Sequence, residues 1–355
     1  MFELDGGGFV SKYEIQNNPG KYPVYSSQTT NNGTMGYISS YKYDLECLTW
    51  TTRGYAGVVF YRNEKFSVSN SGLLIFKRNI IYNYRYFLFV FQMADIQKSM
   101  TAGNIPQFTV EMMKEAVLTY SNNLNEQRKI SQLFYTLDKI ISLYERKMSL
   151  LEKLQKALFS KLFVNKKNET PSIRFKGFFE FWEKNNISDL CKINRGNSKY
   201  TANYIKQNIG KYPVYSSQTQ NEGISGNIST YEYDGEFITW TMDGVNAGTV
   251  FYRNAKFNVS SSGVLSVKSD MQINTKFLFY VLRLMNLNQE NIGETIPHFT
   301  ISMMEKLEIT ILNNVQEQTK IAEVFSSLNL TYAQLKRKLN LIKNIQKSVL
   351  NKMFV

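Results

Sequence analysis

The ten residues GKYPVYSSQT occupy Gly20–Thr29 and return unchanged at Gly210–Thr219. The match continues through TWT, centred on Trp50 and on Trp240, and through FYRN at 60–63 and 251–254. The offset is 190 residues at first and 191 after one extra residue near Asn246. A nearly constant offset over such a length indicates one structural module used twice.

Each copy of the module begins with short β-forming segments. Residues 20–74 are rich in Tyr, Val, Thr and Phe, and Gly, Asn and Ser interrupt them at turn-like spacings. A longer apolar and aromatic stretch follows, at 82–93 in the first copy and 276–285 in the second, and its length favours a helix. The sequence therefore predicts a mixed α/β fold for each globular part.

Each copy ends in a long helical pattern without Gly or Pro. Apolar residues recur at alternating spacings of three and four, which is typical of a coiled-coil seam. Asn123 and Asn314 stand where helix caps are expected, each with a Glu three residues later. Gln155 and Gln346 interrupt the two seams at matching positions. The equal length and phase of the seams predict that the two helices pair antiparallel, each about 57 Å long at 1.5 Å per residue.

The composition favours a polyanionic partner. The 42 Lys and Arg residues exceed the 29 Asp and Glu residues, which gives a net charge of +13, and 43% of residues are apolar. Two cysteines and one histidine, His298, are too few for a disulfide framework or a zinc cluster. The sequence has no signal-peptide pattern and no apolar run that could span a membrane, so we expect a cytoplasmic protein without a membrane partner.

Catalytic motifs are scarce. The sequence contains no phosphate-binding glycine loop, no zinc-protease motif and no methyltransferase-like glycine motif with an Asn-Pro-Pro run. The paired carboxylates Asp44 and Glu46, repeated as Asp234 and Glu236, leave open a carbohydrate-active enzyme. A basic coiled-coil adaptor that binds only proteins is a further alternative. Neither alternative needs a metal or a cofactor on this chain.

The repeated VYSSQT is the best candidate for a surface that reads DNA. Its hydroxyl and amide groups can pair with base edges, and nearby basic residues can hold phosphates. Arg53 is replaced by Asp243 in the second copy, which predicts a difference of at least one base between the two targets. The candidate DNA-binding residues are Lys21, Tyr25, Ser26, Ser27, Gln28, Thr29, Arg53, Arg62 and Lys65, and in the second copy Lys211, Tyr215, Ser216, Ser217, Gln218, Thr219, Asp243, Arg253 and Lys256.

Taken together, the duplicated modules, the matched helices, PSIRFKGF at 171–178 with Trp182, and Glu-Gln-x-Lys-Ile at 126–130 and 317–321 resemble the specificity subunit of type I restriction-modification systems. The resemblance implies target recognition domains at 1–121 and 171–312, spacer helices at 122–164 and 313–355, and a linker at 165–170. It also implies a non-catalytic protein that reads a bipartite site in double-stranded DNA. Its partners would be adenine methyltransferase subunits, which bind S-adenosylmethionine, and the resemblance allows a translocating restriction subunit.

Two features depart from the family pattern. The first copy begins at the point that matches Cys191, so it has no counterpart of residues 171–190. The globular parts of the two copies also resemble each other more than the helices do, whereas recognition domains usually diverge. Because the reading loops are so alike, we expect the two half-sites to resemble each other as inverted repeats.

Overall fold

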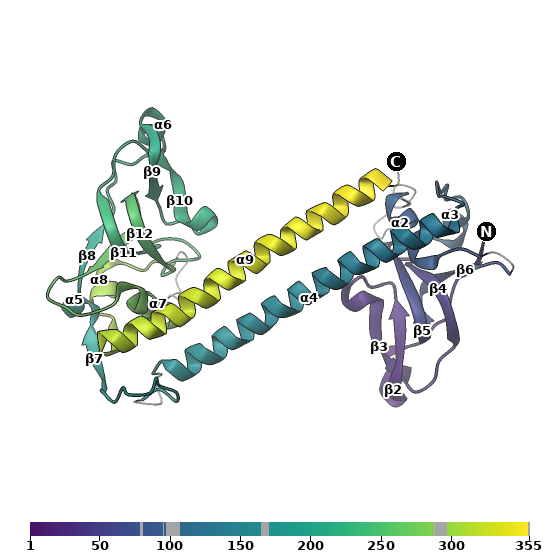
Figure 1. Ribbon diagram of the computed structural model, residues 1–355, viewed down its shortest axis with the longest axis horizontal. Helices are drawn as coiled ribbons and strands as arrows, with labels where there is room; N and C mark the ends of the chain where they lie inside the picture. Colours follow the sequence, from purple (N-terminus) through teal and green to yellow (C-terminus); the bar gives the residue numbers. More distant parts are fainter. Residues whose placement is uncertain are drawn as a thin grey trace. The chain divides into compact units, whose positions relative to one another are not determined.

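The computed structural model describes residues 1–78, 81–94, 96, 107–164, 170–285, 287 and 297–353. The chain divides into two compact units (Figure 1). Unit 1 comprises Met1–Arg146 and Lys336–Val355, and unit 2 comprises Lys147–Leu335. Within the described ranges, no helix is both long enough and apolar enough to cross a bilayer. Most of the predicted linker, residues 165–169, and the last two residues of the second spacer lie outside the description.

Unit 1 is built on a six-stranded sheet in the order β1-β6-β4-β5-β2-β3. Strand β5 joins the two parts of this sheet, because it pairs antiparallel with β4 and then, from Ser67 onward, parallel with β2. The elements are β1 (Phe2–Asp5), α1 (Lys12–Asn17), β2 (Pro19–Ser26), η1 (Thr30–Gly33), β3 (Thr34–Ile38), β4 (Tyr43–Thr51), β5 (Val59–Ser69), β6 (Ser71–Phe76), α2 (Tyr84–Met93) and α3 (Val110–Lys114).

Unit 2 repeats this sheet strand for strand, in the order β8-β13-β11-β12-β9-β10. The predicted internal repeat and the mixed α/β class are therefore confirmed. A second sheet, β7 with β14, is present only in this unit among the described residues. The elements are β7 (Trp182–Asn186), α5 (Ile187–Leu190), β8 (Cys191–Arg195), α6 (Ala202–Gln207), β9 (Ile209–Tyr215), η3 (Gln220–Gly223), β10 (Ile224–Ile228), β11 (Tyr233–Trp240), β12 (Val250–Val259), β13 (Gly263–Val267), α7 (Thr275–Met285), α8 (Ile301–Glu305) and β14 (Glu308–Leu312).

A tryptophan lies at the centre of each core. Trp50 and Trp240 have no exposed surface, and their indole N–H groups donate to the backbone oxygens of Phe108 and Phe299 at 3.3 and 3.1 Å. Gly72 lies flat against the Trp50 ring, since a Cβ at this glycine would come within 2.0 Å of the indole. Gly263 has the same relation to Trp240. The conserved TWT of the repeat is thus explained by packing.

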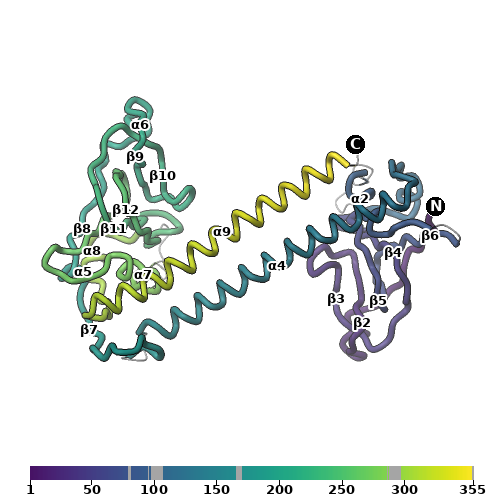
Figure 2. Tube along the Cα trace, viewed as in Figure 1, coloured from purple at the N-terminus to yellow at the C-terminus, as the bar shows by residue number. Residues whose placement is uncertain are grey.

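The long helices are α4 (Leu124–Leu162) and α9 (Val315–Met353). In unit 1, Gln346 donates to Asp138, and Lys343 pairs with Glu145 farther along α4. In unit 2, Gln155 donates to Asn329 at 2.9 Å. Because higher numbers on one helix meet lower numbers on the other, the helix segments within each unit run antiparallel, as predicted (Figure 1 and Figure 2). Both seam glutamines bond across to the partner helix.

The helix caps are only partly as predicted. The side-chain oxygens of Asn123 and Asn314 accept first-turn amides, including those of Glu126 and Glu317 at 3.3 and 3.1 Å. The side chains of Glu126 and Glu317 do not accept from the backbone amides of the cap residues, so the predicted capping boxes are incomplete. Glu126 instead accepts from Ser121, and Glu317 accepts from an arginine.

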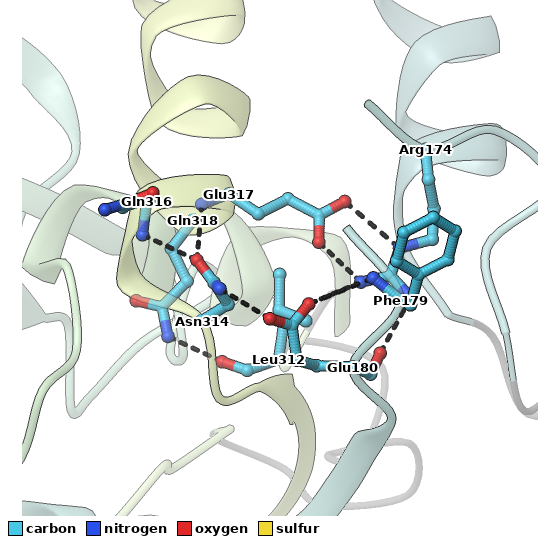
Figure 3. Close-up of polar contacts among 8 residues, drawn as sticks. All are labelled: Arg174, Phe179, Glu180, Leu312, Asn314, Gln316, Glu317 and Gln318. Atoms are coloured by element: carbon cyan, nitrogen blue, oxygen red, sulfur yellow. Dashed lines mark hydrogen bonds and ion pairs between the residues drawn. The ribbon is translucent and has the colours of Figure 1, made fainter. Parts of the chain in front are cut away.

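That arginine belongs to the segment before β7 (Figure 3). Arg174 reaches both carboxylate oxygens of Glu317, at 3.1 and 2.6 Å, and the Glu317 side chain is only 1% exposed. Glu180, on the same segment, accepts from the side-chain amide of Asn314 at 2.7 Å. Residues 174–180 therefore fasten the first turn of α9 within unit 2.

Candidate nucleic-acid interface

The repeated VYSSQT forms the end of β2 or β9 and the loop that follows. One serine of each copy anchors a neighbouring loop: the backbone amides of Thr52 and Met242 donate to the hydroxyl oxygens of Ser27 and Ser217 at 2.8 and 3.0 Å. These bonds fix the connection after β4 or β11, which carries Arg53 or Asp243. Part of the sequence identity between the copies is therefore structural.

A glutamine fastens the turn of the same loop. The side-chain amide of Gln28 donates to the backbone oxygen of Thr34, and that of Gln218 donates to the backbone oxygen of Ile224 at 2.5 Å. In each unit, the turn between the glutamine and its acceptor has left-handed backbone angles, with φ of 48° at Asn31 and 47° at Asn221. Each glutamine keeps its side-chain oxygen and its second amide hydrogen for another partner.

A buried arginine lies beneath each loop. Arg62 is 2% exposed, its guanidinium carbon lies 3.4 Å from the Tyr25 ring centroid, and Nε donates to Thr49 at 3.0 Å. Arg253 repeats the contacts on Tyr215, at 3.5 Å, and its Nη2 also donates to the backbone oxygen of Glu222 in the turn at 2.7 Å. Burial lowers the pKa of Arg62 to about 10 and also lowers that of Arg253.

This burial does not suit the phosphate contacts expected of these two arginines, nor the base contact expected of Tyr25, which is 3% exposed. Charge alone suggested that role. Strand alternation indicates burial instead, because alternate residues of a strand face the same side and Arg62 is an even number of residues from Phe60 and Phe66. Phe66 is fully buried, as strand alternation would predict for that side.

Other predicted residues of unit 1 gather around a surface hollow. Ser26, Ser27, Gln28 and Arg53 line it together with Lys12, which the sequence analysis did not select. The remaining lining residues are Phe9, Val10, Ser11, Met35, Ser69 and Asn70. A hollow with two cations, four serine hydroxyls and two side-chain amides can accept an anion or a polar base edge.

A second hollow lies at the corresponding place in unit 2. Arg195, Gly196, Ser198, Tyr200, Ser260 and Ser261 line it. None of these was predicted. Asp243, the counterpart of Arg53, bonds through its carboxylate to Nδ1 of His298 at 2.8 Å. Thr219 accepts from Asn246, and Ser216 donates weakly to Gly223 at 3.4 Å, so these predicted residues hold the loop.

The four predicted lysines belong to a different cluster. Lys65 pairs with Asp44 at 3.3 Å and donates to Tyr41, whose ring packs on Tyr22 beside Lys21. Unit 2 repeats this cluster with Lys256, Asp234, Tyr231, Tyr212 and Lys211. Lys21 lies five residues before Ser26 in β2, up to about 17 Å away at 3.3 Å per residue. The structure therefore divides the predicted residues of each unit into two exposed groups and one buried group.

The paired carboxylates have partners of their own. Asp44 and Asp234 form the ion pairs just described, while Glu46 and Glu236 accept from the hydroxyls of Tyr61 and Tyr252. Across the described ranges, no three His, Cys, Asp or Glu side chains gather as metal ligands.

Comparison with known proteins identifies the family. The model of the type I restriction modification DNA specificity domain matches residues 1–153 and 180–344, so the chain belongs to this family. The specificity subunits of type I restriction-modification systems that make up the family are non-catalytic, and this chain is accordingly not an enzyme. The carbohydrate-active alternative is therefore wrong.

Individual relatives agree with this assignment. A candidate type I specificity subunit of Mycoplasma pneumoniae, S.MpnORF507P, is 28% identical over 333 residues, which cover 93% of this chain and 88% of the relative. The crystal structure of a type I restriction-modification S subunit from M. genitalium covers all of this chain and 94% of its own, with a TM-score of 0.76 at 16% identity. A chain from a study of complex assembly in a type I system covers 99% of this chain and 97% of its own, with a TM-score of 0.53 at 12% identity. At these identities the two structures establish the fold alone.

Proposed function

We propose that the chain reads a bipartite site in double-stranded DNA, with one half read by each unit. The observation that carries the proposal is the repetition of one sheet, one fastened loop and one hydroxyl-lined hollow with a cation in both units. DNA binding through phosphates needs exposed cations, and base reading needs donors and acceptors held in place. In each unit, the exposed lysines and the residues around the hollow provide these cations, donors and acceptors.

Membership of the type I specificity family suggests that the chain works with other protein subunits. We infer that the chain docks DNA adenine methyltransferase subunits and directs them to the site, and that S-adenosylmethionine binds those subunits rather than this chain. A translocating restriction subunit can join the same complex. The two long helices suit a spacer between reading units, because each runs for 39 residues without interruption.

The loops also suggest what the site looks like. Because both loops are fastened by the same serine, glutamine and arginine, we propose that the half-sites are similar in sequence. They should differ where the side chains of matching positions differ in charge, at Arg53 in unit 1 and the Asp243–His298 pair in unit 2.

The test maps DNA methylation. The purified chain is mixed with a DNA adenine methyltransferase (modification) subunit from the same host, and adenine methylation of genomic DNA is mapped with and without the chain. We expect methylation at a bipartite motif only when both proteins are present. Methylation by the modification subunit alone at the same motif would contradict the proposal.

A further inference from the structure

The hollows of the two units correspond in position but not in charge. Ser260 and Ser261 of unit 2 stand where Ser69 and Asn70 stand in unit 1, at the end of the long strand β12 or β5. In unit 1 the lining contains two cations, Lys12 and Arg53. Their counterparts in unit 2 are Ala202, the first residue of α6, and Asp243. Neither cation of unit 1 is therefore present at the matching position of unit 2.

Arg195 supplies the charge from another strand. It is the last residue of β8, opposite Gly263 in the β13 register, and its side chain is exposed at the hollow. The corresponding strand of unit 1 ends one residue earlier, at Asp5, and Gly6 follows it. Unit 1 therefore has no side chain where Arg195 stands, and each hollow obtains its cations from positions that the other leaves neutral or acidic.

The nearby charges leave Arg195 available. Lys199 is engaged by Glu232 at 2.8 Å, and Asn197 donates to the same carboxylate at 3.1 Å. Asp243 is engaged by His298. No described residue forms an ion pair or a side-chain hydrogen bond with Arg195. The Tyr200 hydroxyl donates to Asn258 and the Ser260 hydroxyl donates to the backbone oxygen of Tyr215 at 3.1 Å, so both are occupied. The groups left for a ligand are the Arg195 guanidinium and the hydroxyls of Ser198 and Ser261.

The backbone beside Arg195 leaves no room for a side chain. A Cβ at Gly196 would come within 2.5 Å of the Ser260 backbone oxygen and 2.7 Å of Val259. The chain therefore passes directly over the end of β12, and Gly196 N donates to Ser262 at 2.9 Å. This contact holds Arg195 and the two serines on one rim.

We propose that the hollow of unit 2 binds a DNA backbone phosphate through Arg195, with the hydroxyls of Ser198 and Ser261 as further donors, in place of the Lys12 and Arg53 of unit 1. The proposal rests on the proposed function and names a contact residue within it. A guanidinium with hydroxyl donors suits phosphate oxygens, which accept several hydrogen bonds at once. Such a contact adds affinity without regard to base sequence.

The experiment measures how the affinity for a random-sequence duplex depends on salt. Each phosphate contact contributes about 0.9 to the slope of log affinity against log salt. We expect Arg195→Ala to reduce the slope by about this amount, so that the ratio of wild-type to variant affinity falls about 3.5-fold between 50 and 200 mM salt. Arg195→Lys should keep the wild-type slope. Lys192→Ala, the same charge change on the opposite face of β8, is the matched control and should leave the slope unchanged.

A double variant tests whether the two positions serve one hollow. In Arg195→Ala with Asp243→Arg, the cation returns at the position that unit 1 uses, and the slope should return to the wild-type value. An unchanged slope in Arg195→Ala, or no recovery in the double variant, would overturn the proposal. Wild-type protein with no salt-dependent binding would instead overturn the proposed function itself, so the two failures are distinguishable.

Discussion

Replacing Arg253 by methionine should loosen the loop of unit 2 while leaving the loop of unit 1 intact. Methionine fills much of the same volume between Tyr215 and Phe251 but donates no hydrogen bond. The change removes the donors to Thr239 at 3.1 Å and to the backbone oxygen of Glu222 at 2.7 Å. The turn at Glu222 then loses its hydrogen bond to the buried side chain at position 253.

The size of the effect follows from these contacts. A buried acceptor left without a donor costs about 1–3 kcal/mol, which applies to the Thr239 hydroxyl; the Glu222 oxygen lies at an exposed residue and can bond to water instead. Stacking of a desolvated cation on an aromatic ring contributes about 2 kcal/mol more. The loss of the buried charge relieves a desolvation cost of several kcal/mol, in keeping with the lowered pKa of Arg253. We expect a net local destabilisation of about 2 kcal/mol, equivalent to about a 30-fold change in the opening equilibrium.

Hydrogen exchange measured by mass spectrometry reports this opening directly. Amides of residues 216–223 should exchange about 30-fold faster in Arg253→Met, whereas residues 26–33 of the same molecule serve as an internal control and should not change. Arg62→Met should instead affect residues 26–33, through the lost stack on Tyr25 and the lost donor to Thr49, and should leave 216–223 unchanged. Exchange at 216–223 within twofold of the wild-type rate would refute the assignment of Arg253 as the support of the loop.

Three further predictions concern stability and reactivity. Gly263→Ala places a Cβ 2.1 Å from the buried Trp240 ring and should destabilise the protein by about 3 kcal/mol in urea unfolding, whereas Gly6→Ala, whose Cβ would meet nothing within 3.8 Å, should be nearly neutral. Arg174→Met leaves the buried Glu317 carboxylate unpaired and should cost about 3–5 kcal/mol, and adding Glu317→Met should recover much of that loss; equal stability of the single and double variants would contradict a buried ion pair. Burial raises the pKa of the Cys47 and Cys191 thiols to about 12, so iodoacetamide at pH 8 should label neither in the native protein and both after unfolding, as mass spectrometry would show.

The sequence predicted the architecture because helices, strands and duplicated modules each leave a regular spacing of residues in the sequence. The seam spacing gave two helices whose observed bounds, Leu124–Leu162 and Val315–Met353, begin two residues inside the predicted spacers. The fixed offset gave two copies of one sheet. The division into recognition domains, spacers and linker stays a prediction, as does the set of DNA-binding residues.

The candidate site was harder to predict because residue type does not reveal burial. Arg62 and Arg253 were assigned to phosphates by their charge, whereas each is stacked on a tyrosine under the loop. Gln28 and Gln218 were expected to face bases, yet one amide hydrogen of each is used within the turn. Arg195 was missed because comparison of the copies draws attention to matched residues. At the sequence offset of 190 its counterpart is Asp5, whereas the strand register puts Gly6 at its place.

The most direct test of DNA reading by this chain is a methylome in which unit 2 alone is altered. The chain and its modification subunit are expressed in a host that lacks adenine methylation, with either the wild-type loop or the variant Gln218→Ala. This substitution removes the bond to the Ile224 oxygen and the amide group proposed to contact a base. We expect a bipartite motif for the wild type, with one half relaxed or lost in the variant and the other half unchanged. An identical motif in both cultures, or methylation that does not require the chain, would contradict it.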